Sequence, residues 1–98
     1  ARKIAGMAEA CQIPVAPHDC TGPVVFMASC HFSLHARNTL VQESVRAFYT
    51  GWYKELVTEL PIVSQGNISL SEAPGLGIEL MPDIEKRADA VVRMSEAT

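Results

Sequence analysis

Two residues with acid–base side chains, His18 and Glu43, each follow a short apolar run. The run 13–17 leads into His18, the run 38–42 leads into Glu43, and a helix-like stretch lies between them. This order predicts two parallel strands joined by a crossover helix, and side chains at the carboxyl ends of such strands share one crevice. Histidine exchanges a proton near neutral pH, and a protonated glutamate can donate a hydrogen bond to a developing oxyanion. The pair therefore predicts proton transfer, although either residue alone is more typical of a capping or solvated group.

The elements that must position this pair are short. We predict a helix over residues 1–11, a strand over 13–16, a second helix from Thr21 or Gly22 to Ala36, and a strand over 38–42. Pro23 suits the first turn of the second helix, where its missing N–H is not needed. The amino end of this helix faces the predicted crevice with free N–H groups, which favours an anionic ligand such as a carboxylate.

From Glu43 onward the alternation of helix and strand ends. The remaining chain predicts turns, a short strand over 67–70, one helical turn within 82–87 and an extended segment over 90–93. It also carries an aromatic cluster, made of Phe48, Tyr49, Trp52 and Tyr53. Packing against a barrel rim is the simpler role for these rings, and a sugar site is the alternative.

Two strands cannot close a parallel sheet, which needs both faces covered. A (β/α)₈ barrel takes about 250 residues. The first helix also lacks a capping residue and an initiator methionine. At 98 residues, the chain is too short for such a barrel, so we expect a fragment of an α/β protein: residues 1–43 as the final β/α units of a TIM barrel, and residues 44–98 as a tail that returns elsewhere.

Other reactive side chains carry weaker signals. Cys11, Cys20 and Cys30 are odd in number and lack a C-x-x-C pair, which predicts free thiols in a reducing compartment. Cys20 is near the proposed site, but no base is arranged for it as a nucleophile, so packing is preferred. His31 and His35 stand four residues apart on an apolar helix without a carboxylate at helical spacing, so we do not predict a metal site there.

The composition limits the functional class. The 98 residues are 48% hydrophobic and 19% charged, with a net charge of −3. The basic residues are scattered, so a nucleic-acid partner is not expected. No apolar run approaches the roughly 20 residues that span a bilayer, and no signal peptide precedes the first helix. A cytoplasmic protein without a membrane partner is the expectation. Arg46 could bind a substrate carboxylate or pair at the surface.

Several separated motifs resemble one family. They are RKIAGMAEA at 2–10, PVAPHD at 14–19, GP at 22–23, Asn38, QE at 42–43 and PGLGIE at 74–79. In this order they resemble the carboxyl-terminal part of enolase-superfamily enzymes of the mandelate racemase subgroup, and among these the acid-sugar dehydratases.

The resemblance implies that His18 ends the seventh barrel strand and Glu43 the eighth. It also implies that residues 44–98 leave the barrel as a tail that packs on the barrel and on a capping domain. It further implies a Mg²⁺-dependent elimination of water from a sugar acid, with His18 as the acid/base and Glu43 as the hydrogen-bond donor to the enediolate. The family's metal-binding carboxylates lie on earlier strands, so Mg²⁺ ligands are expected outside this chain, and Asp19 is not assigned to the metal. A homo-oligomer is also implied. The alternatives are a racemase or epimerase of a 2-hydroxy acid, and a non-catalytic interaction module.

Overall fold

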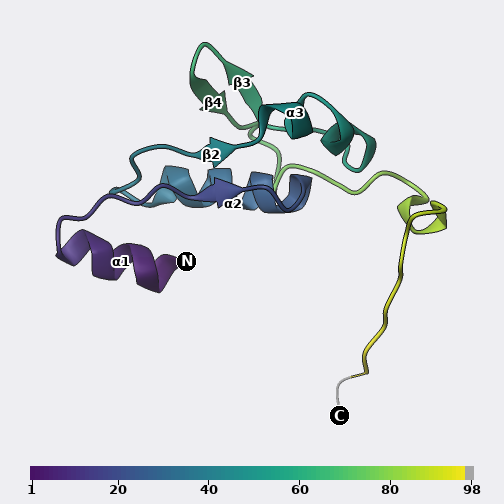
Figure 1. The fold of residues 1–98 in the computed structure, drawn as a ribbon, viewed down its shortest axis with the longest axis horizontal. Coiled ribbons are helices and arrows are strands. Elements are labelled where there is room, and N and C mark those ends of the chain that lie inside the picture. The colour runs from purple at the N-terminus through teal and green to yellow at the C-terminus, as the bar shows by residue number, and fades with distance from the viewer. Residues whose placement is uncertain (97–98) are drawn as a thin grey trace.

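A computed structural model describes residues 1–96 of the chain, and Figure 1 shows its arrangement. The elements, in chain order, are α1 (Arg2–Ala10), β1 (His18–Asp19), α2 (Pro23–His35), β2 (Glu43–Ser44), α3 (Arg46–Tyr49), η1 (Trp52–Glu55), β3 (Ile62–Ser64), β4 (Asn67–Ser69) and η2 (Ile84–Lys86). The predicted helices over 1–11 and 21–36 and the helical turn within 82–87 are confirmed.

Local chemistry explains where α2 begins and where α1 ends. Pro23 occupies the first turn of α2, after Gly22 as the N-cap, so its missing N–H leaves no bond unmade. Phe26, Met27 and Cys30 lie on the buried side of α2. The chain leaves α1 through Gln12, whose φ of 58° turns it back toward β1.

The parallel pair joins β1 to β2, with His18 opposite Glu43 and Asp19 opposite Ser44. The predicted strand limits were wrong: only a single bridge, between Val15 and Thr39, forms within the predicted ranges 13–16 and 38–42. Pro14 removes a ladder donor in the first of these ranges, Pro17 directly follows that range, and regular pairing resumes only beyond Pro17. His18 and Glu43 thus lie in the paired segment itself. β2 also includes Ser44, the first residue of the predicted tail 44–98.

The register changes between the bridge and the strands. Val15 pairs with Thr39, 24 residues later, whereas His18 pairs with Glu43, 25 residues later. The second strand therefore carries one extra residue, which defines a β-bulge within 40–42. Its hydrogen bonds agree: the Leu40 N–H donates to Val15 O at 2.8 Å, and the Glu43 N–H donates to Pro17 O at 2.8 Å.

A β-hairpin follows the parallel pair in the chain. β3 and β4 are antiparallel, with Ser64 opposite Asn67, and a two-residue loop joins them. Both loop residues, Gln65 and Gly66, have positive φ, as the tight hairpin turn of this length requires. The predicted strand over 67–70 is confirmed as β4, whereas its partner β3 is not evident from the sequence.

The buried core is small and lies between α2 and the segment after β2. Phe26, Cys30 and Tyr53 form it, with half-buried side chains of α3 and the hairpin packed around them. The Phe26 ring stacks on Tyr49 with centroids 5.7 Å apart. Trp52 meets Tyr53 edge-on at 4.6 Å. The aromatic cluster thus packs on α2 and on itself, and its packing against a barrel rim stays a prediction.

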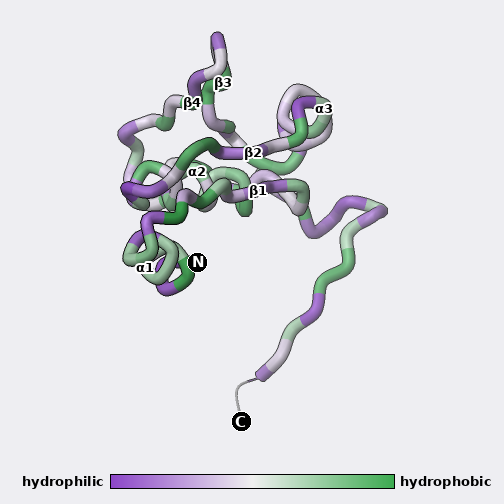
Figure 2. The backbone as a smooth tube through the Cα atoms, turned by 60° about the vertical axis from the view of Figure 1, so that its left-hand side comes forward, coloured by the Kyte–Doolittle hydropathy of each residue, from purple (hydrophilic) through white to green (hydrophobic). Residues whose placement is uncertain are grey.

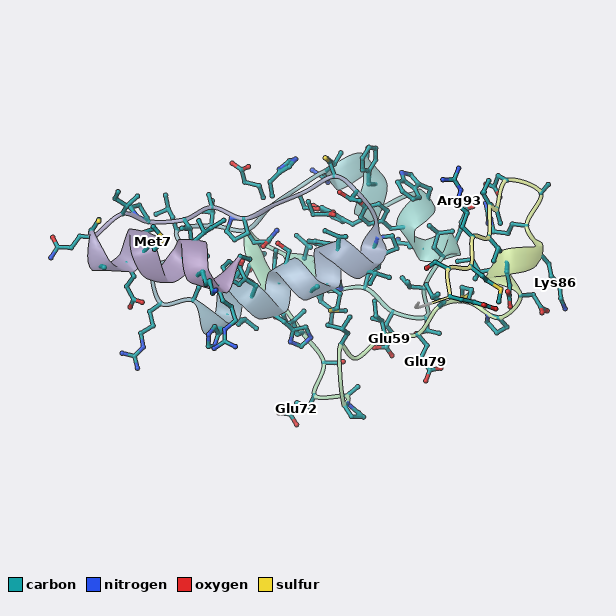
Figure 3. All side chains as sticks on the ribbon, turned by 90° about the horizontal axis from the view of Figure 1, so that it is seen from below. Met7, Glu59, Glu72, Glu79, Lys86 and Arg93 are labelled. Atoms are coloured by element: carbon teal, nitrogen blue, oxygen red, sulfur yellow. The ribbon has the colours of Figure 1, made fainter. Side chains whose placement is uncertain are left out.

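The molecule is open in shape. Its radius of gyration is 15.5 Å, whereas a compact domain of 100 residues has about 13 Å. Figure 3 shows Met7 of α1 at one end and Lys86 and Arg93 at the other. Figure 2 shows apolar segments along α1 and just before β2. Ile4, Met7 and Leu40 are among the exposed apolar side chains there, each at least 70% accessible.

Candidate active site

The predicted pair of His18 and Glu43 comes together in the structure. The Nδ1 atom of His18 lies 3.3 Å from Oε2 of Glu43. The two side chains are 51% and 56% exposed, so both can be reached by a ligand. Paired residues on parallel strands project to the same face of the sheet, which is why one residue from each strand suffices to form the contact.

The next residue of β1, Asp19, points to the opposite face and is fully buried. Its Oδ2 atom accepts a hydrogen bond from the Tyr53 hydroxyl at 2.8 Å. Its Oδ1 atom accepts from the backbone N–H groups of Thr21 at 3.2 Å and Gly22 at 3.4 Å. A buried carboxylate is costly unless it is hydrogen-bonded, so these three donors explain how Asp19 is accommodated. Asp19 therefore fixes the loop between β1 and α2 and ties it to η1.

Burial changes the acid–base properties of two groups around Asp19. Burial, and then the hydrogen bond to Asp19, raise the pKa of the Tyr53 hydroxyl well above its usual range. Burial, with a smaller contribution from the Asp19 charge, raises the pKa of the Cys30 thiol to about 11. Both groups are neutral at physiological pH, so neither acts as a base or nucleophile there.

The remaining candidates lie away from the pair or serve the fold. The Nε2 atom of His31 lies 3.1 Å from Leu76 O, so His31 connects α2 to the segment 74–79 that carries the PGLGIE motif, as a structural histidine would. His35 is exposed at the end of α2. Cys20 is an exposed free thiol. Arg46 is exposed and forms no ion pair with any side chain in the described part of the chain.

The side chains of this stretch do not fit a Mg²⁺ site by themselves. Magnesium prefers an octahedral set of oxygen ligands, with one or two carboxylates from the protein. Within residues 1–96, no group of three or more His, Cys, Asp or Glu side chains comes together to hold a metal ion. The two carboxylates next to the site do not combine either, since Glu43 is exposed beside His18 and Asp19 is buried on the other face. That Mg²⁺ ligands lie outside this chain stays an expectation.

The sequence analysis missed three residues around the site. They are Asp19 in its buried role, Tyr53 as its partner, and Gln42, whose side chain bonds Ser29, Ser33 and the backbone of Glu43. An aspartate two residues before Thr21-Gly22 is a local signal, because its side chain can accept from backbone N–H groups at the start of a helix. No local signal links Asp19 to Tyr53, which lies 34 residues later. Gln42 has no signal of its own beyond its place before Glu43 in the QE motif.

The comparisons with known proteins identify the family. Residues 1–84 match the enolase C-terminal domain-like family, and the chain belongs to it. A solved enolase of the mandelate racemase subgroup from Agrobacterium tumefaciens is 64% identical, covers 87% of this chain and 23% of its own, and superposes with a TM-score of 0.76. The predicted resemblance to this subgroup is confirmed, and the fold is the α/β fold of part of an enolase-superfamily barrel protein.

Two curated relatives carry named activities. The D-xylonate dehydratase of Haloferax volcanii is 37% identical over 79 residues, which are 81% of this chain and 19% of that protein. The D-galactonate dehydratase of Xanthomonas campestris is 34% identical over 95 residues, which are 89% of this chain and 24% of that protein. The chain thus spans about a fifth to a quarter of the length of these relatives. Among the described residues, no helix is long and apolar enough to cross a membrane.

Proposed function

We propose that this chain is the carboxyl-terminal part of a Mg²⁺-dependent acid-sugar dehydratase, a lyase that eliminates water from a sugar acid. The contact of His18 with Glu43, 3.3 Å apart on paired parallel strands, is the observation that carries the proposal. The family assignment and the two curated dehydratases support it.

In the proposed reaction, a base outside this chain removes the proton α to the substrate carboxylate. Protonated His18 gives its proton to the β-hydroxyl, which leaves as water, and the resulting enol becomes a keto acid. Glu43, in its protonated form, donates a hydrogen bond to the oxygen that gains negative charge. Because residues 1–96 supply no magnesium site, the ion would be held by ligands elsewhere in the protein, and the roles of His18 and Glu43 do not depend on contact with it.

The proposal extends to the neighbours of the chain. Residues 1–43 would be the last β/α units of the barrel, and residues 44–98 would pack on the barrel and a capping domain. Exposed apolar side chains on α1 and α2, such as Met7, Val24 and Leu34, support burial against such partners. We further propose that the protein is cytoplasmic, in keeping with the free thiols of the chain. The homo-oligomer that the family resemblance implies is also part of the proposal.

The test is His18→Asn in the complete enzyme. Asparagine keeps a polar side chain of similar reach but cannot act as an acid, so turnover of a sugar acid should fall by about 10²–10⁴-fold. Formation of the keto acid measures turnover, and circular dichroism verifies the fold. His35→Asn is the matched control, because it removes an exposed histidine of α2 that is not part of the pair.

Two results would count against the proposal. Undiminished turnover in His18→Asn would remove the assignment of His18. Incorporation of solvent deuterium at the α-carbon without formation of a keto acid would replace dehydration by racemisation or epimerisation.

A further inference from the structure

The β-bulge decides which side chain lies beside His18. From the bridge between Val15 and Thr39, three residues lead to His18, but four lead to Glu43. In an unbroken register, Gln42 would pair with His18, and Glu43 would pair with the buried Asp19. Because a shift of one residue turns each side chain to the other face of a strand, the extra residue is what presents Glu43 on the side of His18.

The side chain of Gln42 is held in place just before Glu43. Its Oε1 atom accepts hydrogen bonds from Ser33 Oγ at 2.7 Å and Ser29 Oγ at 2.9 Å, both on α2. Its Nε2 atom donates to Glu43 O at 2.8 Å. Ser29 and Ser33 are one helical turn apart, so both hydroxyls reach the same acceptor. We call this set, Ser29, Ser33 and Gln42, the glutamine clamp.

The clamp fixes the bulge from its end. An unbroken register requires Gln42 to turn away from α2, which breaks both hydroxyl bonds and the bond to Glu43 O. The residues between the bridge and β2 provide little to hold the bulge themselves, since Leu40 and Val41 are 70% and 49% exposed.

We propose that Gln42 is a positioning residue, clamped by Ser29 and Ser33, which sets the register that places Glu43 beside His18. This inference rests on the proposed function, because it explains how the hydrogen-bond donor of that reaction is held. A glutamine opposite His18 could still donate a hydrogen bond, but it has no carboxyl group, so the register matters for chemistry as well as for packing.

The test is the double substitution S29A/S33A in the complete enzyme. It removes both donors to Gln42 without touching the site. We expect kcat to fall by about 10²-fold, as misplacement of a reacting group by about 1 Å does. KM for the sugar acid should change little, because the lost alignment acts in the chemical step. S29T/S33T restores the hydroxyls and should restore kcat. S64A/S69A is the matched control, since it removes two exposed serines of the β3–β4 hairpin.

A role confined to packing gives a different result. In that case S29A/S33A lowers the melting temperature but leaves kcat of the folded enzyme unchanged, which would overturn the inference. The combination with Glu43→Gln is decisive. If the clamp acts through Glu43, S29A/S33A adds little further loss of kcat in the Glu43→Gln background. If the kcat losses of S29A/S33A and Glu43→Gln instead multiply in full in the combined variant, the inference is also overturned.

The same set of variants separates this inference from the proposed function. If Glu43→Gln itself retains full activity, the proposed role of Glu43 fails. If Glu43→Gln is impaired while S29A/S33A matches the S64A/S69A control, the proposed function stands and only the clamp inference fails.

Discussion

The bond between Tyr53 and Asp19 gives a prediction of measurable size. Tyr53→Phe keeps the buried ring and its contacts with Trp52 but removes the donor that lies 2.8 Å from Asp19 Oδ2. A hydrogen bond to a charged group is worth about 1.5–3 kcal/mol. The buried carboxylate would keep only two longer bonds, from backbone N–H groups at 3.2 and 3.4 Å. We expect the free energy of unfolding to fall by about 2 kcal/mol, roughly a 30-fold change in the folding equilibrium.

The assay is urea unfolding of the complete enzyme at pH 7.5, followed by tryptophan fluorescence. Tyr49→Phe is the matched control. Tyr49 stacks on the same core ring, Phe26, but its hydroxyl makes no hydrogen bond within residues 1–96. The control should therefore change the free energy of unfolding by less than about 0.5 kcal/mol.

The pH dependence gives the prediction a second, independent measure. The folded state raises the pKa of the Tyr53 hydroxyl above that of the unfolded chain, which is about 10. The folded state therefore binds this proton more tightly, and the resulting stability is complete below pH 10 and lost as pH rises further. Tyr53→Phe should lack this alkaline loss. If Tyr53→Phe and Tyr49→Phe are equally stable at pH 7.5 and show the same alkaline loss, the account of the Asp19 site is wrong.

Two further predictions concern single residues. Cys30, whose thiol pKa is raised to about 11 by burial, should resist labelling by a thiol reagent at pH 8 in the folded protein, while the two exposed cysteines react; equal labelling of all three, read by mass spectrometry, would contradict the described core. Gly51→Ala should destabilise the protein, because the new Cβ would lie 2.6 Å from Ala47 O. Gly6→Ala should instead stabilise it by about 0.5–1 kcal/mol, because Gly6 lies on an α-helix with open space around the new Cβ. Thermal melts that reverse this order would refute the packing around η1.

The sequence predicted the helices well because their signals are local. Pro23 marks the first turn of α2, and the apolar periodicity of residues 4–11 marks α1. The pairing of His18 with Glu43 followed from general rules for parallel strands, and the structure brings the two side chains into contact. Their chemical roles remain proposals.

The strand limits and the buried site of Asp19 could not be read from the sequence. Apolar runs mark where a strand is buried, but hydrogen-bond pairing depends on the neighbouring strand. Here regular pairing resumes only beyond Pro17. Asp19 reads as a polar neighbour of His18 until Tyr53, far along the chain, is placed against it. β3 was missed for a similar reason, since its signal is the hairpin turn at Gln65 and Gly66 more than its own composition.

The extra residue before β2 also has a consequence for how sequences of this family diverge. Loss of one codon anywhere between Thr39 and Gln42 would leave the composition nearly unchanged, yet it would exchange the faces of glutamine and glutamate. Point substitutions at the exposed Leu40 and Val41 change neither the count of residues nor the register. Selection should therefore constrain the length of this segment more strictly than the identities of its residues. An alignment gap placed in the segment would assign the wrong residue of a relative to the position of Glu43.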